Sequence, residues 1–206
     1  MKLAARLSLL LGILVLNQTV FATDLNRAIL DSSIIGDYET IESLLKKGAD
    51  ANARSKFGKS ALMYATENGN EEVVRLLLGK GADINARSVV GCTALTYAAE
   101  NGHQGLVKYY LGLGAKTYPK TRAGWDALAM ASRQNHLQVV RTLIKHNANV
   151  NTSDKNGESA LMAAAMRNHI DMVKLLLKAD ADVHVRNKDG MSAMMLAACK
   201  GHHGVM

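Results

Sequence analysis

The apolar residues of this chain recur at helical spacing in a series of similar blocks. Within each block they fall at positions i, i+3 and i+4, as in Val74, Leu77 and Leu78. This spacing places them on one face of an α-helix and the polar residues on the other. An Ala-rich segment precedes each block and begins after a residue that can cap a helix, such as Ser60. The pattern therefore predicts pairs of short helices, each with one buried face.

Three columns of this pattern are expected to form the core. Burying each of their side chains is worth about 1.5–3 kcal/mol, and no single helix pair can cover its own apolar face. The columns consist of Ile41, Val74, Val107, Val140 and Val173; of Leu44, Leu77, Tyr110, Leu143 and Leu176; and of Leu45, Leu78, Leu111, Ile144 and Leu177.

The blocks return every 33 residues without a shift in register. A fixed period of this size is typical of a stacked array, in which each unit buries its apolar face against its neighbours. Glycine marks the register at positions 58, 91, 124, 157 and 190. Two residues after each glycine lies a predicted helix cap: Ser60, Thr93, Asp126, Ser159 and Ser192.

The unit starts with GKSALMYA at residues 58–65 and ends with GADIN at residues 81–85, and it resembles the ankyrin repeat. The resemblance extends over about 180 residues. It implies an all-α fold, an ankyrin-repeat solenoid of stacked helix-turn-helix units with projecting β-turn fingers. The Pro and His of the family pattern T-P-L-H are absent, and Ala61 and Met63 stand there in the first full unit. We therefore expect weaker hydrogen bonding between successive turns.

On this basis the chain divides into four segments. We predict a signal peptide at residues 1–22, an N-terminal capping repeat at 23–54, four full 33-residue ankyrin repeats at 55–186 and an incomplete C-terminal repeat at 187–206. The capping repeat lacks the preceding glycine turn, and its helices are expected at residues 25–33 and 38–47. The last apolar edge is expected to be lightly covered: either the sequence is truncated at residue 206, or this edge frays, self-associates or docks a partner.

The N-terminal segment has the pattern of a secretory signal. Lys2 and Arg6 form a positive region before the apolar run Leu7–Leu16, and cleavage is expected after about Ala22. The run is shorter than the roughly 20 residues that cross a bilayer, which favours a cleaved signal over an uncleaved anchor. We expect the mature chain, with no transmembrane segment, in a bacterial periplasm or secreted. A eukaryotic secretory route is the alternative, and there Asn151 would be a glycan acceptor.

Composition agrees with one folded, non-disordered array. Of the 206 residues, 48% are hydrophobic, 4% are aromatic and one is proline, with a net charge of +7. Cys92 and Cys199 lie three repeats apart, roughly 30 Å at about 10 Å per helix layer, so they cannot form an intramolecular disulfide. We expect two free thiols that behave as small apolar side chains.

No reactive constellation emerges from the repeats. His103, His136, His169 and His202 are each 33 residues apart, too far to share a metal ion, and they coincide with the family's G-H position at the start of the second helix. No nucleophile motif, phosphate-binding glycine loop or metal-ligand spacing is present. The chain is therefore expected not to be an enzyme, with no cofactor and no metal.

A partner site is predicted on the fingers. In the ankyrin family the variable positions flank the glycine of each repeat, and here three successive fingers carry apolar residues among basic ones. The predicted partner-binding residues are Lys56, Phe57, Lys59, Val89, Val90, Arg122, Trp125 and Lys155. Trp125 is the only Trp, and aromatic anchors surrounded by cations are typical of binding hot spots. The alternative is that these side chains pack finger against finger and stiffen the turns.

The resemblance implies a non-catalytic scaffold that binds a protein on its concave finger and first-helix face. We expect a partner with an acidic surface and an apolar anchor pocket, no specific nucleic acid, and a monomer unless the C-terminal edge self-associates. One alternative is binding of polyanions or anionic membrane surfaces through the basic finger edge. Another, permitted by the resemblance to bacterial periplasmic ankyrin proteins, is an accessory role in oxidative-stress defence. The connection Lys116–Pro119 departs from the other repeats, either as drift or as a recognition feature.

Overall fold

The computed structural model describes residues 24–205, which divide into two compact units. Unit 1 ends at Asp83, and unit 2 begins at Ile84. Within the described residues every regular element is a helix, which confirms the all-α class. None of the helices in residues 24–205 has both the length and the apolar character needed to cross a membrane. The predicted signal peptide lies outside the described residues.

Unit 1 contains two helix pairs joined by a long loop. Residues 24–35 form the first helix of the first pair, close to the predicted 25–33. The other helices are α2 (Tyr38–Lys46), α3 (Ala61–Glu67) and α4 (Glu71–Gly79). Asp37 caps α2 by accepting a hydrogen bond from Thr40 N at 3.0 Å, and its bonds with Thr40 hold the pKa of Asp37 below its ordinary value. Helix α4 packs against α3 and α2.

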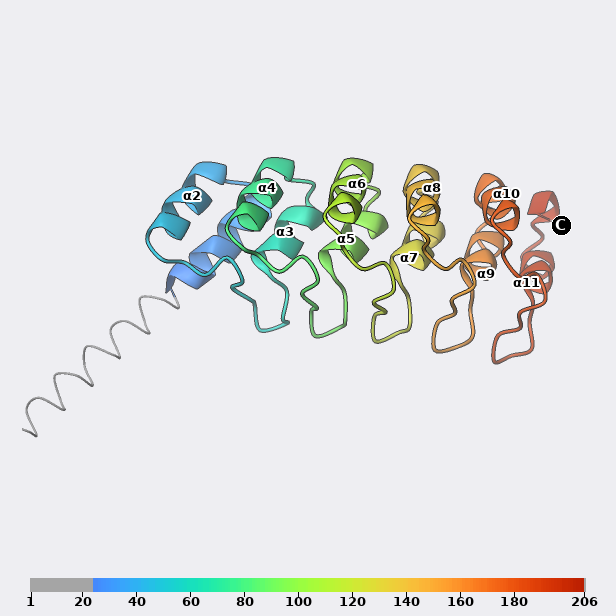
Figure 1. Cartoon of the computed structure of the whole chain (residues 1–206). Coiled ribbons are helices and arrows are strands. Elements are labelled where there is room, and N and C mark those ends of the chain that lie inside the picture. Colours follow the sequence, from blue (N-terminus) through green and yellow to red (C-terminus); the bar gives the residue numbers. More distant parts are fainter. Residues whose placement is uncertain (1–23, 206) are drawn as a thin grey trace, which may run out of the picture. The chain divides into compact units, whose positions relative to one another are not determined.

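Unit 2 continues the same pattern through three helix pairs and a shorter last one. The elements are α5 (Ala94–Glu100), α6 (Gln104–Gly112), α7 (Ala127–Arg133), α8 (Leu137–Lys145), α9 (Ala160–Ala165), α10 (Ile170–Lys178), α11 (Ala193–Cys199) and the 3₁₀ helix η1 (His203–Val205). Figure 1 shows the first helices of unit 2 in one row, the second helices in another, and the connecting loops projecting beyond the first row.

Two of the three predicted core columns are buried, and the prediction that the third is buried is wrong. The columns through Val140 and Leu143 are buried in every repeat. In the column through Ile144, only Leu111 is buried and Leu177 is 42% exposed. Its place in the core is taken by the column one residue before the valines: Val73, Leu106, Val139 and Met172. The buried face of the second helix therefore has the spacing i, i+1 and i+4, because it contacts both its own first helix and the neighbouring second helix.

The predicted capping column is confirmed. All five members accept a hydrogen bond from the backbone N–H three residues later, as the cap of a helix N-terminus does. Asp126 does more than the others. Its Oδ1 accepts from Ala129 N at 2.9 Å, and its Oδ2 accepts from the Thr152 hydroxyl at 2.6 Å. One buried carboxylate thus caps α7 and fastens it to the loop of the next repeat.

The histidine column ties successive repeats of unit 2 together. His136 Nε2 lies 2.9 Å from Glu100 O, His169 Nε2 lies 3.3 Å from Arg133 O, and His202 Nε2 lies 3.1 Å from Met166 O. A carbonyl oxygen only accepts, so each Nε2 carries the proton. These histidines supply a tie between successive repeats that does not depend on the missing family His.

We predict that Asp126→Ala lowers the free energy of unfolding by about 2–4 kcal/mol, because it removes a helix cap and leaves the Thr152 hydroxyl without its charged acceptor. Chemical denaturation measures the effect.

The matched control for this prediction is Asp126→Ser, which installs the residue found at this position in three other repeats. It keeps the cap and loses only the bond to Thr152, so its effect should be about half as large. Equal losses in the two variants would contradict the double role of Asp126.

Candidate functional site

Five finger loops precede the first helices: residues 54–59 in unit 1, and 87–92, 120–125, 153–158 and 186–191 in unit 2. Each loop is closed by two backbone hydrogen bonds, which join equivalent residues in all five fingers. In the second, Ser88 N donates to Cys92 O at 2.9 Å and Gly91 N donates to Ser88 O at 2.9 Å. The fingers are thus short hydrogen-bonded turns and not irregular coil.

A polar column three residues before each glycine stabilises these turns. In the second finger the Ser88 hydroxyl accepts from Cys92 N at 3.1 Å, and in the fourth Asp154 Oδ1 accepts from Asn156 N and Glu158 N, both at 2.8 Å. The column comprises Ser55, Ser88, Thr121, Asp154 and Asn187. Sequence reasoning missed it, although its members are all types that hydrogen-bond a backbone N–H ahead of them. Aligning the repeats on their glycines would have found it.

Successive fingers of unit 2 are bonded to one another. Arg122 N donates to Val90 O at 2.7 Å, Lys155 N to Ala123 O at 2.9 Å, and Lys188 N to Asn156 O at 2.8 Å. The approach is so close at Gly124 that an added Cβ would lie 2.7 Å from Lys155 N, and its φ of 97° also favours glycine. The four tips of unit 2 are therefore held in a fixed line.

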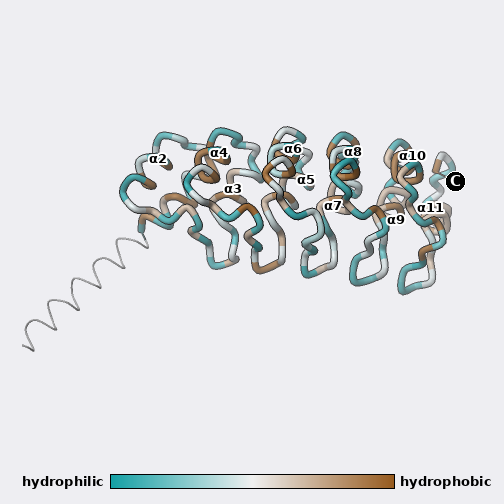
Figure 2. The backbone as a smooth tube through the Cα atoms, viewed as in Figure 1, coloured by the Kyte–Doolittle hydropathy of each residue, from teal (hydrophilic) through white to brown (hydrophobic). Residues whose placement is uncertain are grey.

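The first fingertip of unit 2 is apolar, and the three fingertips that follow it are basic. Val89 and Val90 are 46% and 51% exposed. At the same finger position as Val89, the next three fingers carry Arg122, Lys155 and Lys188, all exposed. Figure 2 shows the tip of the loop before α5 as hydrophobic, while the following loops are hydrophilic at theirs. We call residues 89–90, 122–123, 155–156 and 188–189 the fingertip row.

The structure corrects the expectation for Trp125. This side chain is only 8% exposed and so cannot be a solvent-facing anchor. Its backbone closes the third finger, because Trp125 O accepts from Thr121 N at 2.8 Å and Trp125 N donates to the Thr121 hydroxyl at 3.1 Å. Cys92, at the same position of the preceding finger, is likewise buried, with 6% exposure. The prediction of a solvent-facing Trp125 anchor is therefore wrong.

Lys59 in unit 1 is also not available as predicted. Its side chain is 13% exposed, it pairs with Glu67, and its Nζ lies 4.5 Å from the centre of the Tyr64 ring. The tip of the same finger is different. Phe57 is 63% exposed, and Lys56 Nζ lies 5.1 Å from the centre of its ring. Unit 1 thus presents an exposed aromatic residue beside a cation at its own tip.

Some of the basic residues at the base of the fingers have structural contacts. The Arg87 guanidinium donates to Gly91 O at 3.3 Å and to Lys120 O, and Lys120 Nζ donates to Ser153 O at 3.0 Å. In the last finger, Arg186 Nη1 donates to Gly190 O at 2.8 Å. These bonds hold one finger against the next or close a turn. The exposed charge at the tips therefore comes from Arg122, Lys155 and Lys188.

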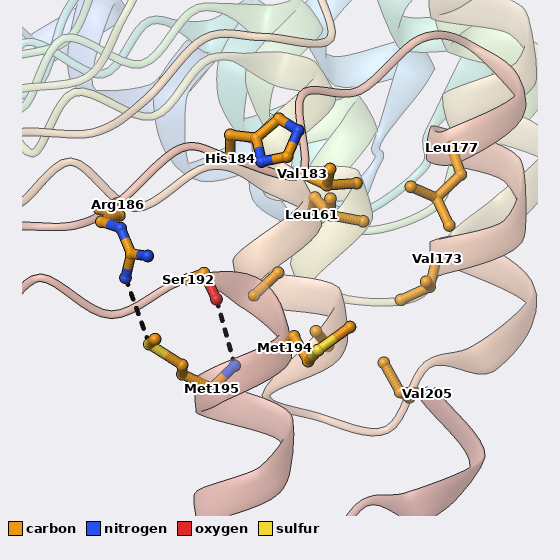
Figure 3. Close-up of a pocket in the computed structure, with 12 residues that line it drawn as sticks. Leu161, Val173, Leu177, Val183, His184, Arg186, Ser192, Met194, Met195 and Val205 are labelled. Carbon is orange, nitrogen blue, oxygen red and sulfur yellow. Dashed lines mark hydrogen bonds between the residues drawn. The ribbon is translucent and has the colours of Figure 1, made fainter.

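A second surface feature is an apolar hollow of about 540 Å³ at the last helices of unit 2. Leu161, Val173, Leu177, Met194 and Val205 surround it, and His184 and Arg186 lie at one edge (Figure 3). Met194 is 63% exposed, whereas Leu161 and Leu128 at the same position of the two preceding repeats are 3% and 1% exposed. Within the described residues, only the short η1 lies over this face, in agreement with the expected lightly covered edge.

The described residues contain no group of three or more His, Cys, Asp and Glu side chains that could hold a metal ion. Cys92 is buried and Cys199 is exposed, and both thiols are free, as expected from their spacing. His136, His169 and His202 each bond through Nε2 to a backbone carbonyl of the preceding repeat.

The burial of Trp125 leads to a test. We predict that Trp125→Ala lowers the free energy of unfolding by about 3–5 kcal/mol, as for other buried aromatic residues. Val90→Ser, one finger away and half exposed, should change it by less than about 0.5 kcal/mol. Thermal and urea denaturation of both variants would check this, and an unchanged melting temperature for Trp125→Ala would contradict the burial.

Leu161 and Met194 occupy the same position in successive repeats, and their different exposure gives a second test. Leu161→Ala should cost about 2–5 kcal/mol, while Met194→Ala, at the equivalent position, should cost less than about 1 kcal/mol because its side chain is mostly solvated. The same denaturation measurements apply. Similar losses for both would mean that the face around Met194 is covered in solution.

Comparison with known proteins identifies the family. A family model described as ankyrin repeats (3 copies) matches residues 28–121 and again residues 101–187. The comparison with curated proteins gave no match. Ankyrin repeats generally mediate protein–protein interaction and typically act as non-enzymatic modules. The matches span well over half of the chain and agree with the stacked helix pairs of unit 2, so the chain belongs to the ankyrin repeat family.

Proposed function

We propose that this protein is a non-catalytic interaction module that binds another protein through the fingertip row of unit 2. The observation that carries the proposal is the exposed pair Val89 and Val90 on a turn that is bonded to its neighbour. Two adjacent valines about half exposed at a loop tip gain free energy when a partner covers them. Their turn is already ordered, so binding does not have to fix it.

The charge of the row defines the partner further. Arg122, Lys155 and Lys188 follow the valines at the same position of the next three fingers. A partner that places an apolar pocket over Val89 and Val90 would bring its adjoining surface over these cations. An acidic surface there speeds encounter and fixes the orientation. We therefore infer a partner with an apolar pocket next to a carboxylate-rich surface.

The basic row alone would also suit a polyanion or an anionic membrane surface. Such ligands make no use of Val89 and Val90, and their binding falls steeply with salt because it depends on the release of counterions. A protein contact anchored on the valines keeps most of its affinity at high salt. Salt dependence therefore separates these two functions.

We propose a periplasmic or secreted location for the mature chain, supported by the sequence of residues 1–22. In that compartment the module would meet its partner after export. Fractionation of cells that express the full chain, with N-terminal sequencing of the product, tests this directly. A product that keeps residue 1 and stays in the cytoplasm would refute it. An accessory role in oxidative-stress defence remains a proposal that rests on family resemblance.

The interaction proposal is tested by capturing partners from a periplasmic extract and then measuring affinity for the captured protein. We predict that the double variant Val89→Ser and Val90→Ser weakens binding at least about tenfold, which corresponds to about 1.4 kcal/mol. Val183→Ser is the matched control, since Val183 is 48% exposed in another loop of unit 2, and its affinity should equal that of the wild type.

The charge component is measured with Lys155→Glu and Lys188→Glu. Each should slow association and reduce its salt dependence, because electrostatic steering is weakened, while changing dissociation little. Lys145→Glu, an exposed position on α8, controls for net charge. Equal binding by the Val89/Val90 double variant and by the wild type would rule out the fingertip row as the site.

A further inference from the structure

A cation-lined hollow of about 380 Å³ lies at the irregular connection of unit 2. Neither the fingertip row nor the apolar hollow includes any of its residues. The ionisable groups that line it are three cations and one phenol. Its lining consists of Asn85, Arg87, Lys116, Tyr118, Pro119 and Lys120.

The repeat itself shows how unusual this hollow is. At the position of Lys116 the other repeats have an acidic or amide residue, such as Asp182, whose Oδ1 accepts from His184 N at 2.8 Å. At the position of Tyr118 three repeats have asparagine. Asn151 donates to Asp180 O at 3.1 Å and accepts from Asp182 N at 2.8 Å. In this one connection the acidic turn is replaced by a cation and the bridging amide by an aromatic ring.

The substituted connection is nevertheless held in place. Lys116 N donates to Asn85 Oδ1 at 3.0 Å, and Asn151 accepts the same bond from Asp182 N two repeats further on. Only the backbone of Lys116 is used in this bond, and its side chain is exposed with Nζ 5.9 Å from the centre of the Tyr118 ring. Tyr118 is itself 69% exposed. A cation and a ring are thus presented to solvent on an ordered backbone.

The two other cations are positioned by the fingers. Arg87 is fixed by Gly91 O and Lys120 O, and Lys120 by Ser153 O. These acceptors are backbone carbonyls, which orient the two side chains. Three cationic residues therefore line one hollow, together with Asn85 and Tyr118.

We propose that this hollow binds a phosphate monoester whose organic part packs against Tyr118. Three cations suit a dianion with three acceptor oxygens better than the single charge of a carboxylate. The Tyr118 ring and Pro119 give an apolar wall beside the charges, which suits a flat organic group. The site does not rest on the proposed protein interaction, because it shares no residue with the fingertip row.

The test is an NMR titration of the purified chain at constant ionic strength with inorganic phosphate and with phenyl phosphate. Saturable shifts should be confined to the amides around Arg87 and residues 116–120, within about 10 mM ligand, since a Kd of 1 mM requires only about 4 kcal/mol. Phenyl phosphate should bind more tightly than phosphate because its ring contacts Tyr118. Benzoate, with one charge, should bind at least about tenfold more weakly than phenyl phosphate.

Two variants restore residues that the other repeats already use, so the fold should tolerate both. Lys116→Asp should weaken both ligands at least about tenfold. Tyr118→Asn should leave phosphate binding unchanged and reduce phenyl phosphate to the level of phosphate. Lys145→Asp makes the same change in net charge on α8 and should have no effect. If Lys116→Asp does not fold, Lys116→Ala replaces it.

Three results would overturn the site: no saturable shift with either ligand, an equal loss with Lys145→Asp, or benzoate binding as tightly as phenyl phosphate. The Val89→Ser and Val90→Ser variant should keep phosphate affinity. The two proposals can therefore fail separately.

Discussion

Burial between repeats is the constraint on which unit 2 depends. Its second helices are nine residues long, too short to be stable alone in water. Each exposes an apolar face that its own first helix cannot cover, and the neighbouring repeat completes the burial. The strict period follows from this, because a shift of one residue would remove every column from its partner. The capping residues fix where the first helices begin, and the histidine bonds join neighbouring repeats, within an arrangement that hydrophobic contact already requires.

The finger surface is free to vary because stacking does not depend on it. Its turns are closed by backbone bonds and by one polar column, and successive turns are joined by main-chain atoms such as Arg122 N and Val90 O. Side chains at the tips therefore contribute little to the fold. Exposed valines there are not explained by the packing of the array, which supports the proposal that another molecule covers them.

The fold could be predicted well because the 33-residue period and the apolar columns can be read directly from the sequence. The cap at Asp126 and the core column through Val140 followed from spacing alone, and the structure confirms both. The error in the column of Leu177 arose because spacing fixes a helix face only to within about one residue, and contacts on both sides decide the rest. Trp125 was misplaced because a turn residue shows no periodicity. Its inward direction depends on the path of the backbone after Gly124.

Departures from the repeat are informative because the array provides its own reference. At most columns a substitution keeps the hydrogen bond, as when Thr or Asp replaces Ser in the cap. At Tyr118 the side-chain bonds of the asparagine column are given up, although Asn85 still holds the loop from the preceding repeat. The fold gains nothing visible from Lys116 and Tyr118, since both side chains are exposed. The bond that asparagine makes in the preceding and following repeats is thus absent at Tyr118, where a cation and a ring face solvent instead. This contrast supports the ligand site proposed at the connection.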